Sequence, residues 1–334
     1  MPSLILSLSC LALCLAAMPA RAAEPLPALD AESKDLTVSG LSSGAFMAVQ
    51  FHVAHSALTR GAGVLAGGPY YCAQGSAMRA LSSCSLSPGF FTPLPKPDTL
   101  RKEVERQAAA QHIDAPENLA RSRVWLLSGG QDRIVKSAVV DGARAFYRQW
   151  LPEAAIVHER LPDAGHAMIV PQAATAGTCA LSAPPFINQC GDFDAPGRLL
   201  AHLLGELSPP AEKAAGELLV FDQGEFVRPE AGMAETAYVY IPAGCRAGGC
   251  RIHIAFHGCR QNMALAGETY VRESGYNRWA ESNRLIVLYP QTSTRKDANG
   301  CWDWWGYTGP GYHTRSAPQI GAVRAMAERL MAKP

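Results

Sequence analysis

The sequence predicts an α/β protein with a mostly parallel central sheet and helices on both faces. Short apolar runs alternate with helix-length segments along most of the chain. Residues 35–56 combine a short strand, a tight glycine-serine turn and a helix. Polar residues follow several of the apolar runs directly, at the strand ends where this fold class carries its functional loops.

The segment 35–56 has the most informative pattern in the chain. A strand at 36–38 leads into Gly40-Leu41-Ser42-Ser43-Gly44, and a helix over 45–51 follows. Strand, G-x-S-x-G and helix together are typical of a nucleophile elbow. Ser42 has glycine two residues before and after it, so we expect it to be the nucleophile, with the Ser43 N–H as an oxyanion donor. The alternative is an ordinary glycine-serine turn.

The composition is that of an ordinary globular protein. The chain has 334 residues, of which 48% are hydrophobic and 18% charged, and its net charge is +1. This length suits one large domain or two medium ones. The balanced charge and the lack of a basic cluster argue against a nucleic-acid partner.

Residues 1–22 are expected to form a signal peptide. The apolar stretch 4–17 is too short to span a bilayer, and it runs into an A-x-A cleavage site at 20–22. Cleavage after Ala22 would leave a mature protein of residues 23–334, secreted to the medium or held in the periplasm. The alternative is a buried N-terminal helix, and the n-region lacks the usual Lys or Arg. No later run is long enough to predict a membrane span.

The cysteines of the exported chain predict disulfides. Without Cys10 and Cys14 eight remain, an even number, which in a secreted protein indicates disulfide pairing. Proximity suggests Cys72–Cys84, Cys179–Cys190 and Cys245–Cys250, and elimination leaves Cys259–Cys301. Zinc binding is the alternative, but no C-x-x-C pair is present.

The remaining elements follow in order along the chain. We expect strands at 62–68, 123–129, 155–158, 218–221, 237–241, 251–256 and 285–289. We expect helices at 99–118, 137–150, 196–206, 267–282 and 320–330, and a loop at 72–100. A proline-containing linker at 207–217 separates the segments 35–206 and 218–331.

A serine nucleophile needs a base and a carboxylate that orients the base. Asp132 lies just past the strand at 123–129, and His166 lies just past the strand at 155–158. The order Ser42, Asp132, His166, with each residue after a strand, is that of α/β-hydrolases. The alternatives are a helix N-cap for Asp132 and an ordinary loop histidine for His166. Asp163 is close to His166 but lacks the position at a strand end.

One motif is out of the usual order. The oxyanion loop of α/β-hydrolases, a strand that ends in His-Gly, normally precedes the nucleophile, whereas here it lies at 256–259. Placing 218–330 ahead of 35–205 restores the order. We therefore expect a circularly permuted α/β-hydrolase fold in a single catalytic domain. In this interpretation His257 is structural, and the Cys259 N–H is the second oxyanion donor.

The disulfide Cys259–Cys301 would hold an aromatic loop beside the oxyanion donors. Trp302, Trp304 and Trp305 would then form the rim of the site, although core packing is the alternative for at least one of them. A tryptophan-rich rim suits an apolar, extended substrate.

Several segments carry a family resemblance. They are GLSSGAFMAVQ at 40–50, AGGPYYC ending at 72, SGGQD at 128–132, FHGCRQ at 256–261, SGYNRWAESNRLIVLYPQ at 274–291 and NGCWDWWGY at 299–307. Together they resemble secreted poly(3-hydroxybutyrate) (PHB) depolymerases of the single-domain, circularly permuted type. The resemblance implies a serine esterase that uses the same triad and oxyanion amides, and it implies that Trp304 contacts the polymer. Many relatives carry a separate substrate-binding module, for which this chain has no room.

The expected function is that of an extracellular serine esterase that acts on poly(3-hydroxybutyrate) or a related short-chain polyhydroxyalkanoate. We expect a monomer that uses no metal or organic cofactor and has no nucleic-acid or membrane partner. One alternative is a secreted esterase for small or plant-wall esters, such as feruloyl or acetyl-xylan esters. The other is a non-catalytic binding protein on a degenerate hydrolase fold.

Overall fold

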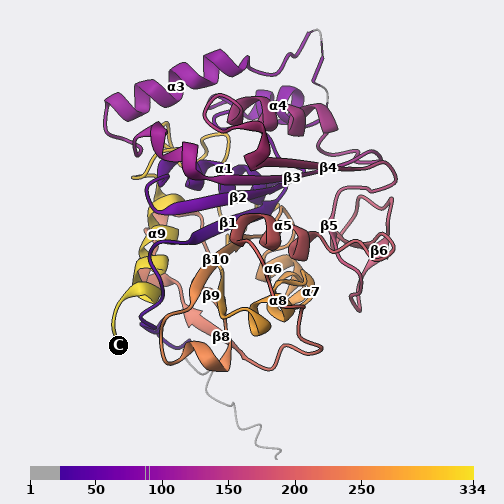
Figure 1. Ribbon diagram of the computed structural model, residues 1–334. Helices are drawn as coiled ribbons and strands as arrows, with labels where there is room; N and C mark the ends of the chain where they lie inside the picture. Colours follow the sequence, from indigo (N-terminus) through magenta and orange to yellow (C-terminus); the bar gives the residue numbers. More distant parts are fainter. Residues whose placement is uncertain (1–22, 87, 90) are drawn as a thin grey trace, which may run out of the picture.

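The centre of the molecule is an eight-stranded sheet (Figure 1). The computed structural model describes residues 23–86, 88–89 and 91–334. The expected signal peptide lies outside these described residues. Across the sheet the strands are β4 (Ile156–Leu161), β3 (Arg123–Gly129), β2 (Thr59–Leu65), β1 (Leu36–Leu41), β10 (Arg251–Phe256), β11 (Leu285–Tyr289), β9 (Thr236–Ile241) and β8 (Glu217–Asp222). The pairs from β4 to β11 are parallel, and β9 runs antiparallel to both its neighbours. The expected fold class, α/β with a mostly parallel sheet, is confirmed.

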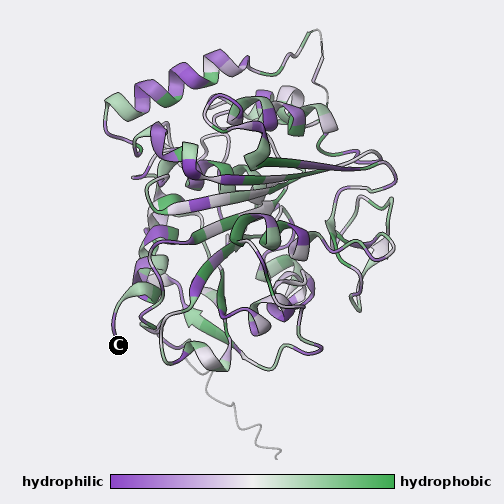
Figure 2. Cartoon of the chain, viewed as in Figure 1, coloured by the Kyte–Doolittle hydropathy of each residue, from purple (hydrophilic) through white to green (hydrophobic). Residues whose placement is uncertain are grey.

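Both faces of the sheet are covered, which explains why the central strands are buried along almost their whole length. Every residue of β1 and of β11 is buried. Figure 2 shows hydrophobic stretches along the strands in the interior and mainly hydrophilic residues on the outer helix α3. Parallel strands buried on two faces are expected to be near-continuously hydrophobic.

Alternate residues of each strand enter two separate cores. Leu126 of β3 packs into one hydrophobic cluster, and its neighbour Leu127 packs into the other. The first cluster also receives side chains from α1 (Ser43–Ala54), α3 (Pro97–Ala109), α4 (Ser137–Tyr147) and α9 (Pro318–Met331). The second receives side chains from α5 (Ala195–Leu204), α7 (Thr269–Glu273) and α8 (Tyr276–Ser282). The period-2 geometry of a strand produces this division, with helices on each side.

The order of the strands explains the displaced oxyanion motif. Read from β8, the sheet runs β8, β9, β11 and β10, and then β1 to β4 in sequence. The C-terminal part of the chain therefore builds one half of the sheet and the N-terminal part the other. Residues 205–216, which contain no helix or strand, connect the two parts. Consequently the carboxyl ends of β10 and β1 are adjacent although they are far apart in the sequence.

Some expected elements have different forms. The helix expected near 267–282 is two short helices, α7 and α8, and α6 (Met263–Ala266) precedes them. Gly267 and Gly275, with φ of 58° and 88°, separate the three helices. The helix expected over 99–118 ends at Ala109, and a 3₁₀-helix (Pro116–Arg121) follows. The expected loop 72–100 contains α2 (Ala77–Leu81) and a π-helical turn (Ser82–Leu86). A small sheet of β5 (Met168–Ile169), β6 (Gly177–Thr178) and β7 (Ile187–Gln189) follows β4.

The described residues form four disulfides, and they pair the cysteines as the sequence suggested: Cys72–Cys84, Cys179–Cys190, Cys245–Cys250 and Cys259–Cys301. Among the described helices, none has both the length and the apolar character needed to cross a bilayer.

Candidate active site

Ser42 occupies the sharp turn between β1 and α1. Its backbone has φ 57° and ψ −123°, a conformation that costs a non-glycine residue about 1–3 kcal/mol and that clusters at functional sites. The Ser42 N–H donates to the Leu65 carbonyl at 2.9 Å, which ties the turn to β2. The strained turn therefore holds Ser42 at the carboxyl end of the sheet.

The two glycines of the G-x-S-x-G motif are required by close backbone contacts. A Cβ at Gly40 would lie 2.3 Å from the backbone of Gly44. A Cβ at Gly44 would lie 2.4 Å from the carbonyl oxygens of both Phe256 and His257. Any side chain at these positions would push α1 away from β1 or β10. The glycines thus bring the start of α1, with Ser42 and Ser43, against the loop after β10.

Asp132 and His166 are joined in the structure. The Asp132 Oδ1 atom accepts the backbone N–H groups of Ile134 and Val135 at 2.7 and 2.8 Å. Its Oδ2 atom lies 2.8 Å from the His166 Nδ1 atom. Because a carboxylate can only accept, Nδ1 carries the proton and Nε2 is left as the basic nitrogen. Both side chains are almost completely buried.

The loop 179–190 holds His166 in place through backbone hydrogen bonds. The His166 N–H donates to the Ser182 hydroxyl at 2.9 Å, and the Gly165 N–H donates to the Cys179 carbonyl at 2.7 Å. The imidazole and the Phe186 ring are nearly perpendicular, with the ring centroids 5.8 Å apart. In the described part of the chain no hydrogen bond joins the Ser42 hydroxyl to this imidazole, as is common in catalytic sites without substrate.

The two expected oxyanion donors lie beside Ser42. The N–H groups of Ser43 and Cys259 have no hydrogen-bond acceptor among the described residues. The preceding amide, that of Gly258, is occupied, because it donates to the Gln261 Oε1 atom at 2.7 Å. Gln261 also donates to the Pro185 carbonyl at 2.8 Å, so it joins the loop after β10 to the segment that contacts the histidine. No pattern in the sequence indicates this role of Gln261.

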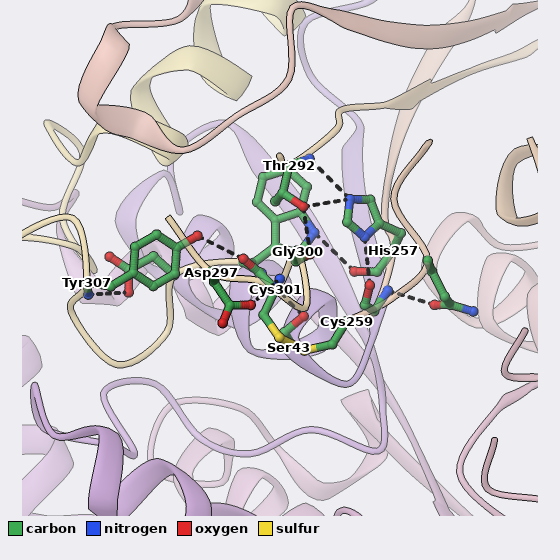
Figure 3. The surroundings of a disulfide bond; sticks show 12 residues. Ser43, His257, Cys259, Thr292, Asp297, Gly300, Cys301 and Tyr307 are labelled. Atoms are coloured by element: carbon green, nitrogen blue, oxygen red, sulfur yellow. Dashed lines mark hydrogen bonds between the residues drawn. A yellow bond between two sulfur atoms is a disulfide. The ribbon is translucent and has the colours of Figure 1, made fainter. Parts of the chain in front are cut away.

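His257 is part of the framework. Burial lowers the pKa of His257 to about 4, so the ring is neutral at neutral pH. Its Nε2 atom accepts the Thr292 N–H at 3.2 Å, and its Nδ1 atom donates to the Gly258 carbonyl at 2.7 Å (Figure 3). The ring therefore shapes the His-Gly turn and has no nitrogen left for a substrate.

The disulfide Cys259–Cys301 joins the loop after β10 to the loop after β11 (Figure 3). The Cys301 N–H donates to the Asp297 Oδ2 atom at 2.9 Å. Covalent closure thus places the aromatic segment 302–307 next to the Cys259 amide.

Ser42 lines an apolar cavity of about 360 Å³. Its lining comprises Ser42, Phe46, Ala77, Ala80, Leu81, Ser85, Leu86, Ile134, Val135, Cys259, Asp297, Asn299, Cys301, Trp304 and Trp305. The walls formed by α2 and the π-helical turn were not expected from the sequence. The apolar residues Ala77, Ala80 and Leu81, at helical spacing after a Ser76 N-cap, were the available signal.

The three tryptophans have different positions. Trp304 and Trp305 line the cavity, and Trp304 stacks on Phe46 with 3.9 Å between ring centroids. The expectation that Trp302 belongs to the rim is wrong. Trp302 is completely buried, because its ring packs against Phe256 and its Nε1–H donates to the His257 carbonyl at 3.0 Å.

Comparison with known proteins points to one family. The family described as "Esterase PHB depolymerase" matches residues 236–331. The chain is 43% identical over 315 residues to a poly(3-hydroxybutyrate) depolymerase of Delftia acidovorans, and it spans 62% of that protein's length. It is 31% identical over 325 residues to a polyhydroxybutyrate depolymerase of Talaromyces funiculosus, with 92% of this chain and 91% of the relative covered.

The solved structures agree with the sequence comparison. The PHB depolymerase of Penicillium funiculosum superposes with a TM-score of 0.84 and 28% identity, covering 92% of this chain and 98% of that one. A serine-to-alanine variant of a PHB depolymerase, crystallised with an R3HB trimer, gives the same values.

Proposed function

The chain belongs to the poly(3-hydroxybutyrate) depolymerase family, and from this we propose that it hydrolyses the ester bonds of poly(3-hydroxybutyrate) or a related short-chain polyhydroxyalkanoate. The observation that carries the proposal is the joined Asp132–His166 pair at the same edge of the sheet as Ser42. An apolar cavity next to Ser42 supports a weakly polar polyester over a charged substrate.

Ser42 acts as the nucleophile in this proposal. The His166 Nε2 atom takes the hydroxyl proton while Ser42 Oγ attacks the ester carbonyl carbon, which forms a tetrahedral oxyanion. Asp132 holds the imidazole in the required tautomer and stabilises its charged form. The C–O bond to the leaving unit then breaks, and the imidazolium gives its proton to the departing alkoxide. The products of this half-reaction are a 3-hydroxyacyl ester on Ser42 and a chain with a free hydroxyl.

Water completes the cycle. His166 takes a proton from a water molecule, the hydroxide attacks the acyl carbon, and Ser42 leaves with the proton that His166 returns. The N–H groups of Ser43 and Cys259 stabilise the oxyanion in both halves, which is typically worth about 3 kcal/mol per donor. Trp304 and Trp305 contact the polymer chain beside the reacting ester.

The protein works outside the cytoplasm in this proposal. Four disulfides in one chain are typical of oxidising compartments, and the first 22 residues have the pattern of a signal peptide. Residues 23–334 form one catalytic domain of permuted α/β-hydrolase type, with 207–217 as the connection between its halves. The protein acts as a monomer.

Clearing of a turbid poly(3-hydroxybutyrate) suspension, run beside hydrolysis of p-nitrophenyl butyrate, tests the function. The parent is expected to act on both substrates, and Ser42→Ala on neither. Ser316→Ala, which changes an exposed serine before α9, is the matched control and should keep both activities. Ester hydrolysis without clearing would move the substrate to small or plant-wall esters. Absence of both activities in the parent would favour a binding protein.

A further inference from the structure

Asp303 is a buried carboxylate in the loop after β11. Its side chain is only 1% exposed, and it lies between Trp302, which belongs to the core, and Trp304, which lines the cavity. Burial of a charged group is costly unless hydrogen bonds replace the lost water. The hydrogen bonds of Asp303 therefore show what the residue does in the fold.

The chain after Asp303 turns around its carboxylate. The two carboxylate oxygens together accept four consecutive backbone N–H groups and one hydroxyl. Oδ1 accepts from Trp305 N at 3.3 Å, Gly306 N at 2.7 Å and Tyr307 N at 3.0 Å. Oδ2 accepts from Thr308 N at 2.8 Å and Thr308 Oγ1 at 2.6 Å. The carboxylate is thus the centre on which this turn is built.

The backbone of Asp303 is fixed to two helices. Its N–H donates to the Gln319 Oε1 atom of α9 at 2.8 Å. Its carbonyl accepts from the Gln50 Nε2 atom of α1 at 2.9 Å. Since α1 begins at the nucleophile turn, these bonds give the carboxylate a fixed position relative to Ser42.

The turn presents two aromatic rings to the cavity. Trp304 stacks on Phe46 at an interplanar angle of 10°, and Trp305 meets Trp304 edge-on, with centroids 5.5 Å apart. Gly306 follows with φ 95°, a conformation that suits glycine. Trp305 and Gly306 both donate to Oδ1, so the direction of the Trp305 ring depends directly on the carboxylate.

We propose that Asp303 determines the substrate specificity of the cavity by fixing the tryptophan wall, so that chains longer than the reacting acyl group gain binding energy there. It is a positioning residue that acts through Trp304 and Trp305 and does not touch the reacting atoms. For its polymer substrate this inference rests on the proposed function. Its general form concerns any ester whose acyl part is long enough to reach the wall.

Asp303→Asn tests the proposal with little change in size. One oxygen becomes an NH₂ group, which faces N–H donors and cannot accept from them. We would compare p-nitrophenyl esters from acetate to octanoate and the 3-hydroxybutyrate trimer. The expected result is a KM about tenfold higher for octanoate and trimer, with kcat within about twofold and acetate hydrolysis unchanged, because only uniform binding is lost.

Two further variants make the test decisive. Asp222→Asn is the control. Asp222 also accepts a turn N–H, that of Gly224 at 2.8 Å, but it lies on the edge strand β8. This variant should keep the parent KM and kcat for every substrate. Thr308→Val removes one of the five bonds and should raise the same KM values by about two- to threefold. It gives a readout if Asp303→Asn does not fold.

The proposal is overturned if acetate and octanoate lose activity equally, or if KM for the long esters does not change. Failure of the proposed function is a separate result. A parent that hydrolyses the p-nitrophenyl esters but leaves the polymer intact would refute the proposed substrate, while the ester series would still report on the tryptophan wall. A parent that hydrolyses neither would overturn both proposals.

Discussion

Replacement of Asp132 by asparagine should abolish activity without unfolding the protein. In the structure Oδ1 accepts two backbone N–H groups, and Oδ2 faces the His166 Nδ1 atom. Asparagine can keep the first interaction only if its carbonyl oxygen takes the place of Oδ1. Its NH₂ group must then face Nδ1, which becomes an acceptor, and the ring proton moves to Nε2. In that tautomer the imidazole cannot take the proton of Ser42.

The size of the effect follows from the same contacts. The wrong tautomer lowers kcat by about 10⁴ in the corresponding serine-protease case, equivalent to about 5 kcal/mol of transition-state stabilisation. The opposite amide orientation would restore the tautomer, but it would place NH₂ against the N–H groups of Ile134 and Val135. Leaving these buried groups without an acceptor costs about 1–3 kcal/mol each. The inactive orientation is therefore the stable one.

The assay is hydrolysis of p-nitrophenyl butyrate, with circular dichroism as the test of folding. Asp163→Asn is the matched control, because Asp163 is a nearby carboxylate on the same loop as His166 but is exposed. We expect the control to keep the parent rate. A folded Asp132→Asn protein with a rate within tenfold of the parent would refute the reasoning about the tautomer.

Two further predictions concern stability. Gly44→Ala places a Cβ 2.4 Å from the backbone carbonyl oxygens of Phe256 and His257, at the end of β10. The destabilisation should exceed the about 1–3 kcal/mol of typical overpacking, so the melting temperature should fall by several degrees. Gly321→Ala, within α9 and with 3.5 Å of clearance, is its control, and equal melting temperatures for the two variants would contradict the prediction. Burial lowers the pKa of His253 to about 3, so this ring stays neutral in the fold at pH values where the unfolded chain takes up a proton. Its contribution to stability is complete above about pH 6.5 and falls by about 1.4 kcal/mol per pH unit as the pH drops towards 3. Urea unfolding at pH values between 4 and 7 gives the free energy of unfolding as a function of pH. This free energy should fall less steeply with decreasing pH in His253→Gln than in the parent, and equal pH dependences would rule out this role.

The elements that the sequence predicted well are those whose patterns depend on local geometry. The run 285–289 could be recognised as a strand because a buried parallel strand needs no polar face. The turn around Ser42 could be recognised because backbone contacts within the motif itself require Gly40. The positions of Asp132 and His166 after strands led us to expect the two side chains to lie together, as they do in the structure.

The features that were missed depend on contacts between distant segments. Trp302 and Trp304 belong to one motif, but only Trp302 reaches the His257 carbonyl, 45 residues earlier in the chain. Gln261 likewise acts through a carbonyl 76 residues away. Neither partner can be identified from spacing along the sequence. The break at Gly275 was visible in principle, but a single glycine within a helical pattern does not reveal its backbone angle.

The sheet and the loops around the site are stabilised in different ways. Three of the four disulfides among the described residues lie near the cavity and the histidine. Cys72–Cys84 and Cys179–Cys190 close loops after β2 and β4, and Cys259–Cys301 joins the loop after β10 to the loop after β11. The sheet is maintained by buried apolar area on both faces. These loops depend instead on covalent closure, which is worth about 3–4 kcal/mol for sequence separations of 11, 12 and 42 residues. A reducing agent would therefore release the loops around the site before it affected the sheet. The protein can lose its function while its secondary structure remains, so a folding assay alone would not detect the loss.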